Sequence, residues 1–217
     1  MKKLASLTIL CFTICMLESN NMVLSAETNI QAKNSADIET NDPTYKEIVY
    51  GAEDAPVTII EYASLTCNHC ATFHNVVFPE IKKNYIDTGK VRFVFRDFPL
   101  DGLAMAGAML ARCAPKGRNK ALLKIMFKNQ TTWAMSKTPI EPLRRYAKLA
   151  GMSSDTVDAC LRNESIISGI RTAQEAADRN HEINATPTFL IEGTKIDGGR
   201  DYQFMADLIE KKLNAKN

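Results

Sequence analysis

The stretch Cys67-Asn68-His69-Cys70 constrains this chain more than any other part of its sequence. A segment rich in β-branched residues, 57–63, precedes the stretch, and a helical pattern over 71–85 follows it. The first cysteine is therefore expected where a strand ends and a helix begins, beside backbone N–H groups without intrahelical partners. A thiolate is stabilised at such a place, so we expect Cys67 to be reactive, with a lowered pKa. The pair could do redox chemistry, hold a metal ion or only staple the fold.

The beginning of the chain has the pattern of a secretory signal over residues 1–26. Two lysines near the start are followed by an uncharged, mostly apolar run, 4–17, which is short for a membrane span. We expect cleavage near Ala26, with an uncleaved anchor as the alternative. Residues 27–44 are rich in polar side chains and are expected to form a flexible N-terminal segment.

Export changes how the cysteines are interpreted. Of six cysteines in the chain, the four beyond residue 26 are Cys67, Cys70, Cys113 and Cys160. An even number in an oxidising compartment favours disulfides over free thiols. The formal net charge of +2, without a long basic run, gives no reason to expect nucleic acid as a partner.

The order of expected elements is β-α-β, then a series of helices, then β-β-α. Strands over 57–63 and 91–96 flank the first helix, so we expect them to be parallel, with a right-handed crossover. A short strand before residue 51 is a further candidate. Five helices are expected in the middle of the chain: 102–113, 117–129, 139–150, 154–162 and 165–182. Strands at 188–191 and 195–197 should pair as a hairpin before a closing helix, 201–213.

Periodicity also predicts which helix faces are buried. A period of 3.6 places Phe73, Val76, Val77 and Ile81 on one face of the first helix. In the closing helix the same argument turns Phe204, Leu208 and Leu213 inward. Trp133 lies in a segment, 131–139, that we expect to be a loop, with the indole as its packed anchor.

Three further residues or pairs suggest a site around the two cysteines. Glu61 lies in an otherwise apolar strand, six residues before Cys67, where burial would raise its pKa and let it relay a proton for Cys70. His69 lies inside the motif and could stabilise the Cys67 thiolate. The pair Thr186-Pro187 precedes a strand, and a cis bond there would leave the Thr186 backbone free to pair with an extended substrate.

Simpler interpretations exist for each of these residues. Glu61 could be a solvated acid at a strand edge, His69 an exposed turn residue and Thr186-Pro187 an ordinary trans turn. His74 follows Cys70 by one helical turn and is more typical of a surface or packing position, although a histidine at this spacing leaves a metal site as an alternative. A zinc site needs four ligands, and no second pair of spaced cysteines or histidines follows, so no metal is expected.

These residues resemble the DsbA-like branch of the thioredoxin superfamily, of the alphaproteobacterial type. The resemblance is carried by Glu61 to Cys70, by Phe93-Val94-Phe95-Arg96-Asp97-Phe98-Pro99-Leu100 and by Ala185-Thr186-Pro187-Thr188-Phe189. It covers about 45–214. It implies an α/β (α+β) class, a thioredoxin fold with an inserted all-helical domain. Residues 45–100 and 184–217 would form the thioredoxin-like domain, and 101–183 the insertion.

The resemblance implies thiol–disulfide exchange on exported proteins in the periplasm. Cys67 would be the exposed reacting sulfur and Cys70 the buried partner, without a bound cofactor, and a DsbB-like, quinone-linked membrane protein would reoxidise the pair. The expected substrates are unfolded or reduced exported proteins, and the expected state is a monomer. Because of Asn68 and Thr186, a reductase or isomerase of the same fold is an alternative function. A non-enzymatic peptide-binding or chaperone module is the remaining alternative.

The same resemblance suggests a second bridge. Cys113 and Cys160 fall on separate helices of the insertion, and a structural disulfide between them resembles a feature of the alphaproteobacterial group. Two separate buried thiols are the alternative. A bridge would close a long loop and stabilise the fold by roughly 4 kcal/mol in the chain-entropy model.

Overall fold

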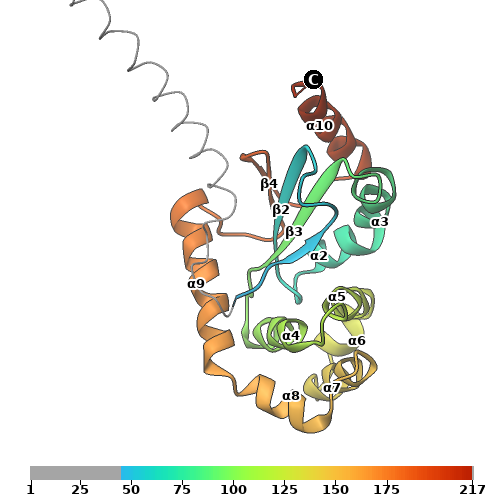
Figure 1. The fold of residues 1–217 in the computed structure, drawn as a ribbon. Coiled ribbons are helices and arrows are strands. Elements are labelled where there is room, and N and C mark those ends of the chain that lie inside the picture. Colours follow the sequence, from blue (N-terminus) through green and yellow to red (C-terminus); the bar gives the residue numbers. More distant parts are fainter. Residues whose placement is uncertain (1–44, 217) are drawn as a thin grey trace, which may run out of the picture. The chain divides into compact units, whose positions relative to one another are not determined.

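A five-stranded sheet lies at the centre of residues 45–216, the part of the chain that this computed structural model describes (Figure 1). The expected signal over 1–26 and the expected flexible segment over 27–44 lie outside the described residues. Neighbouring strands follow the order β1-β3-β2-β4-β5. The five strands are β1 (Ile48–Tyr50), β2 (Val57–Ala63), β3 (Val91–Asp97), β4 (Thr188–Ile191) and β5 (Thr194–Asp197).

Strands β2 and β3 are parallel, as expected for the β-α-β unit, and all other neighbours in the sheet are antiparallel. The crossover is one long helical segment in four parts: α2 (Asn68–Thr72), η1 (Phe73–Val77), α3 (Phe78–Ile81) and η2 (Lys82–Ile86). Glu61 lies near the end of β2, the middle strand, with Phe95 and Phe189 beside it on the two neighbouring strands, so its carboxyl group belongs to the centre of the sheet.

Two of these helical parts, η1 and η2, are π-helical, and this changes which side chains are buried. A π-turn has its hydrogen bonds between residues five apart, so the inward-facing positions follow a longer period. Phe73, Val77, Phe78 and Ile81 are buried, whereas Val76 is 64% exposed. The prediction that Val76 faces the core was therefore wrong, because it assumed a period of 3.6 throughout.

Six helices lie between β3 and β4, and a last one closes the chain (Figure 1). They are α4 (Gly102–Cys113), α5 (Asn119–Lys128), α6 (Gln130–Ala134), α7 (Ile140–Leu149), α8 (Ser154–Leu161), α9 (Glu164–His181) and α10 (Tyr202–Asn214). Helix α6 replaces part of the loop expected over 131–139. Its Trp133 is buried, and the indole N–H donates to the carbonyl of Met126 at 2.8 Å, so the indole anchors this segment as expected.

The two faces of the sheet pack against different helices. Successive strand residues point to opposite faces, so Ile59 joins a large core that includes α2, α3, α4, α5 and α10, while Ile60 joins a smaller one. That smaller core includes Ala177 near the end of α9 and Ile183 after it. Helix α9 thus covers the face opposite to the motif helix.

In α10 the buried side chains are Met205, Ala206 and Ile209. Phe204 is 43% exposed, and its ring lies 5.3 Å from the guanidinium carbon of Arg200. The prediction of an inward Phe204 was wrong, because Met205 and Ile209 offer a second apolar stripe one residue further along the helix.

A buried ion pair joins the helices to the end of β3. Arg112 of α4 contacts the carboxylate of Asp97 at 2.5 Å, and both side chains are almost wholly buried. The same guanidinium donates to the hydroxyl of Tyr45 at 2.9 Å and to the carbonyl of Lys46. The start of the described chain, β3 and α4 are thereby fixed to one another.

Candidate active site

Cys67 lies where the sequence predicts it, between β2 and the first helix. It is the extended N-cap residue of α2, and its carbonyl accepts a hydrogen bond from the Ala71 N–H at 3.1 Å. Cys67 is partly exposed, whereas Cys70 on the first turn is buried. Both are thiols in this structure. One sulfur can therefore meet a substrate and the other can act only on its neighbour.

Several donors lower the pKa of Cys67 to about 5, from an ordinary value of 9.0. The largest cause is a hydrogen bond from the Cys70 thiol, which is opposed by partial burial. The hydroxyl of Thr186 and the backbone N–H groups of Cys70 and His69 also lower the pKa. Cys67 is therefore a thiolate at neutral pH, the form that attacks disulfides and leaves readily from them.

Thr186 approaches this sulfur from the loop before β4. The Cys67 thiol lies 3.3 Å from the Thr186 carbonyl oxygen, and the Thr186-Pro187 peptide bond is cis. The Thr186 hydroxyl is buried and has no hydrogen-bond partner among the described residues. When Cys67 is a thiol it donates to the Thr186 carbonyl, which opposes ionisation. When Cys67 is a thiolate it accepts from the Thr186 hydroxyl. We attribute the lowering by Thr186 to the hydroxyl for this reason.

Glu61 is fully buried beneath the motif rather than solvated at a strand edge. Burial is the largest cause that raises the pKa of Cys70, and the neighbouring Cys67 and the charge on the Glu61 carboxylate raise it further. One carboxylate oxygen, Oε2, lies 2.7 Å from His74 Nε2, while Oε1 has no hydrogen-bond partner among the described residues. Glu61 is thus held from one side only.

His74 is a functional candidate that the sequence argument treated as a surface or packing residue. Its side chain is 5% exposed, and its ring stacks on Phe127 of α5 with centroids 4.1 Å apart and planes 6° apart. The available signal was its spacing of four from Cys70, which turns both side chains to the same side of a helix. The sequence could not show that Glu61 lies on that side, within hydrogen-bonding distance of His74.

Gln130 of α6 is a second residue that sequence reasoning missed. It is buried, and its amide nitrogen donates to the carbonyl of Leu65 at 2.8 Å and to that of Cys67 at 2.9 Å. These bonds hold the backbone that carries the reactive sulfur. No local pattern indicated this role, because the contact joins residues 63 apart.

The N-terminus of α4 supports the same segment. Thr66 donates from its hydroxyl to Asp101 Oδ2 at 2.7 Å, while Asp101 Oδ1 accepts the N–H of Ala104 and caps α4. The residue just before Cys67 is therefore tied to α4, the first helix after β3.

His69 is exposed on the first turn of α2. The contribution to the Cys67 pKa that the structure identifies at this position is the backbone N–H. The structure thus brings together Cys67, Cys70 and Thr186 as expected, and adds His74 and Gln130 to the set.

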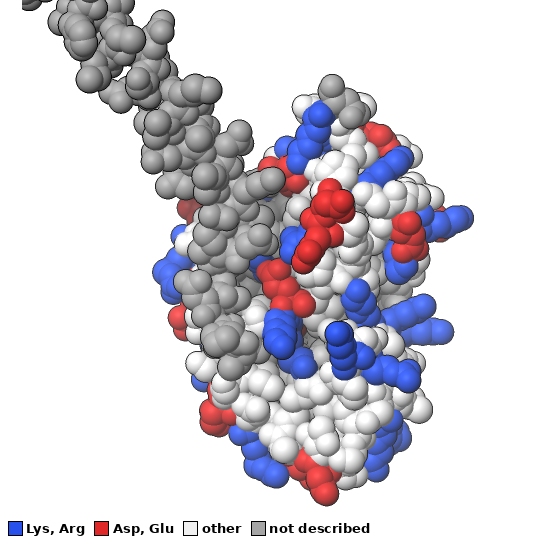
Figure 2. Space-filling model, in the orientation of Figure 1, with Lys and Arg blue, Asp and Glu red and all other residues white. Residues whose placement is uncertain are grey.

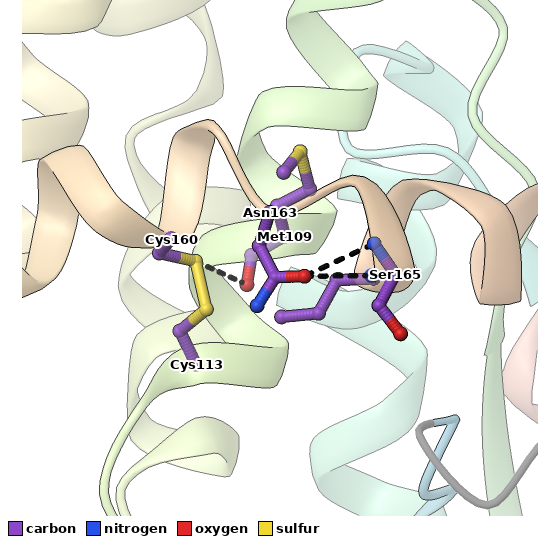
Figure 3. The surroundings of a disulfide bond; sticks show 6 residues. Met109, Cys113, Cys160, Asn163 and Ser165 are labelled. Atoms are coloured by element: carbon purple, nitrogen blue, oxygen red, sulfur yellow. Dashed lines mark hydrogen bonds between the residues drawn. A yellow bond between two sulfur atoms is a disulfide. The ribbon is translucent and has the colours of Figure 1, made fainter.

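Cys113 and Cys160 form a separate pair, joined by a disulfide (Figure 3). The bond links the end of α4 to the end of α8, across 47 residues of sequence. Figure 3 also shows Asn163, whose side chain accepts from the N–H groups of Ser165 and Ile166 and caps α9 directly after the bridge. The bond therefore joins two of the helices between β3 and β4, and the motif cysteines take no part in it.

Among residues 45–216, no cluster of three or more His, Cys, Asp or Glu side chains is arranged to hold a metal ion. None of the helices in that part of the chain is both long and apolar enough to cross a membrane.

Comparison with known proteins places this site in a family. The Thioredoxin_4 family model, described as thioredoxin, matches residues 43–211. A Rickettsia conorii protein assigned by name to the protein-disulfide oxidoreductases is 32% identical over 170 residues. That match covers 77% of this chain but only 60% of the relative, so the rickettsial protein is the longer of the two.

Two solved structures are similar over most of their length. Wolbachia pipientis alpha-DsbA1 has 32% sequence identity and a TM-score of 0.73, and the match covers 78% of this chain and 92% of the other. Oxidised BdbD from Bacillus subtilis has 26% identity and a TM-score of 0.70, with 77% and 93% covered. The expected thioredoxin fold is confirmed, and the chain belongs to the thioredoxin family and to its DsbA-like branch.

Proposed function

We propose that this chain is a thiol:disulfide oxidoreductase that introduces disulfide bonds into exported proteins through Cys67 and Cys70. The observation that carries the proposal is the contrast between the two sulfurs. The pKa of the partly exposed Cys67 is lowered to about 5, while burial raises that of Cys70. A stabilised thiolate favours the reduced form of the pair, which makes its disulfide a strong oxidant.

The reaction begins from the oxidised pair. A substrate thiolate attacks the sulfur of Cys67, the bond between Cys67 and Cys70 breaks, and Cys70 leaves with the electron pair. A second substrate thiolate then attacks the substrate sulfur of this mixed disulfide and releases Cys67 as a thiolate. The substrate loses two electrons and gains a disulfide, and the protein gains both electrons. The low pKa of Cys67 makes it a good leaving group in this second step.

The surrounding residues have separate roles in this proposal. Glu61 supplies the proton that the buried Cys70 needs when it leaves. Thr186 and Pro187 form the ledge against which an extended substrate segment binds, with the Thr186 carbonyl beside the reacting sulfur. His69 acts on the Cys67 thiolate from the first helical turn, where its backbone N–H lowers the pKa of that sulfur.

The domain and export assignments belong to the same proposal. Residues 45–100 and 184–217 form the thioredoxin-like domain and 101–183 the helical insertion, after a signal over 1–26 and a flexible segment over 27–44. The protein then acts in the periplasm as a monomer, on unfolded or reduced exported proteins, and a DsbB-like, quinone-linked membrane protein reoxidises it. Figure 2 shows basic and acidic side chains together on one face, a charge pattern that does not suggest nucleic acid.

The test is oxidation of a reduced two-cysteine peptide by the oxidised protein. We expect rapid oxidation, with loss of activity in Cys67→Ala, while the Cys67 thiolate of Cys70→Ala should attack the oxidised form of the peptide and remain trapped with it as a mixed disulfide. The matched control replaces both Cys113 and Cys160 by Ala, which removes the other pair, and it should oxidise the peptide normally. Activity that survives Cys67→Ala would refute the assignment.

A reduction potential distinguishes the alternatives. An oxidase pair should lie above about −200 mV, whereas a structural staple lies below about −300 mV. Refolding of a substrate with scrambled disulfides would reveal an isomerase, which should act from the reduced form. Binding of unfolded peptide that is unchanged by Cys67→Ala, without any oxidation, would favour the chaperone alternative.

A further inference from the structure

We propose that His74 is a positioning residue of this reaction, and that it keeps a transferable proton on the Glu61–His74 pair for delivery to Cys70. The proposal rests on the function proposed above. It assigns a role to a residue outside the Cys67-Cys70 motif, from a contact that joins the motif helix to the centre of the sheet.

The geometry of the pair is the first argument. Glu61 Oε2 and His74 Nε2 are 2.7 Å apart, with exposed side-chain fractions of 0% and 5%. A distance this short requires a proton between the two atoms. The second oxygen, Glu61 Oε1, is buried and has no partner among the described residues. The carboxyl group therefore has one side bound to His74 and one side free to exchange a proton.

The aromatic surroundings are the second argument, because they fix the imidazole. Its ring is stacked on Phe127 at 4.1 Å between centroids and also contacts Phe78 at 5.1 Å and Phe95 at 5.8 Å. Such walls hold the ring plane and exclude water. Nε2 is kept directed at the carboxylate, and the pair stays in an apolar environment.

Charge then decides how many protons the pair holds. An unpaired buried carboxylate is costly, and a buried pair is most favourable when its net charge is zero. The neutral pair, written as carboxylate with imidazolium or as carboxylic acid with imidazole, holds one more proton than carboxylate with imidazole. That extra proton is the one available to Cys70.

When the bond between Cys67 and Cys70 breaks, the electron pair stays on Cys70 Sγ, and the proton moves from the pair through Glu61 to that sulfur. A buried thiolate becomes a thiol, while the pair changes from neutral to a single negative charge. Solvent restores the proton later, and reoxidation of Cys70 runs the same transfer backwards.

Other groups face the pair from the neighbouring elements. Glu61 interacts electrostatically with Cys70 and with Tyr50 of β1, and Cys70 also interacts with Cys67. Burial and the Glu61 charge raise the pKa of Tyr50, so Tyr50 remains neutral through the working range. Strands β3 and β4 present Phe95 and Phe189 beside Glu61, and α5 presents Phe127.

The experiment measures how fast dithiothreitol reduces the Cys67–Cys70 disulfide across the pH range, corrected for the thiolate fraction of the reagent. Cys70 is the leaving group in this reaction. His74→Gln keeps a donor for Glu61 but cannot carry the additional proton. We expect its rate at neutral pH to fall about tenfold, a modest share of general-acid catalysis. We also expect the decline of the corrected rate at high pH to begin at a lower pH than in the native protein.

A double-mutant cycle separates proton supply from packing. Because His74 acts through Glu61, the variant with both Glu61→Gln and His74→Gln should be no slower than Glu61→Gln alone. Ile81→Val is the matched control, since it disturbs the buried core of the same helical segment without altering the polar pair or the rings around the imidazole. It should lower stability and leave the pH profile in place. Unchanged kinetics in His74→Gln, or losses that multiply in the double variant, would overturn the proposal.

A measurement on the native sequence covers the case in which His74→Gln does not fold. Nitrogen-15 shifts of the His74 ring and the carbon-13 shift of the Glu61 carboxyl in the oxidised protein should show the extra proton on the pair at neutral pH, and a carboxylate with a neutral imidazole there would overturn the proposal. These outcomes differ from failure of the function itself. In that case the native protein would not oxidise the peptide at all.

Discussion

Gln130 donates a hydrogen bond to the carbonyl oxygen of Cys67 at 2.9 Å, although 63 residues separate the two in sequence. The helical segment between β3 and β4 therefore contacts the backbone of the reactive residue itself. Together with the Thr66–Asp101 bond, this contact makes the helices part of the site's support.

Gln130→Leu should loosen that support. The carbonyl of Leu65 loses its donor and that of Cys67 keeps only the Ala71 N–H, and a buried polar group without a partner costs about 1–3 kcal/mol. We expect urea unfolding to show a loss of that size, with slower peptide oxidation. Thr131→Leu on the exposed side of the same helix is the control and should match the native protein in both assays.

The rate of Cys67 alkylation should follow its thiolate. Because the pKa is lowered to about 5, the rate of reaction with iodoacetamide should reach half its maximum near that pH. Thr186→Val removes the hydroxyl that donates to the thiolate, so the midpoint should move to higher pH. A midpoint that stays in place would show that the Thr186 hydroxyl is not a donor to this sulfur.

The stability of the reduced protein should depend on pH in a defined direction. The pKa of Cys67 is about 5 when folded and near 9.0 when unfolded, so the unfolded state binds more protons between those values. The thiolate's contribution is complete above about 9, falls as pH decreases and is lost below about 5. Unfolding free energies of the reduced native protein and of reduced Cys67→Ala should therefore diverge as pH rises through this window. Equal pH slopes would contradict the assignment.

Asp97→Ala should destabilise the fold more than a surface change. It leaves the guanidinium of Arg112 buried without its carboxylate, and breaking a buried pair in this way costs about 3–5 kcal/mol. Thermal or urea unfolding measures the loss. Glu175→Ala, which removes an exposed pair with Arg179, is the comparison and should change stability by less than about 1 kcal/mol.

Replacing both Cys113 and Cys160 by Ala should lower stability without altering the reactive pair. The bridge spans 47 residues, and closing a loop of that length is worth about 4 kcal/mol in the chain-entropy model. We expect an earlier urea midpoint and an unchanged alkylation profile for Cys67. A shifted profile would mean that the bridge also acts on the active site.

The sequence predicted the parts of this fold that depend on local pattern. The strands around the motif, their parallel pairing and five inserted helices follow from alternation, period and turn residues, and they are observed. Val76 was misplaced because nothing in a short sequence distinguishes a π-turn from an α-turn. The exposure of Phe204 was missed because two apolar stripes compete on one helix.

The site shows the same division between local and long-range information. Cys67 and Cys70 lie three positions apart in a motif, and Glu61 lies close by in the chain, so their proximity could be expected. The bonds from His74 to Glu61 and from Gln130 to Cys67 depend on how a helix lies over a sheet and on a contact between distant segments. No pattern along the chain encodes either contact.

The bridge between α4 and α8 has a consequence for how the protein is made. Cys160 is buried in the finished fold while Cys113 is partly exposed, so once those helices have packed an oxidant reaches the pair through Cys113. Each newly made copy is then itself a substrate of the disulfide-forming reaction proposed here, and mature copies of the protein are suited to form its Cys113–Cys160 bond.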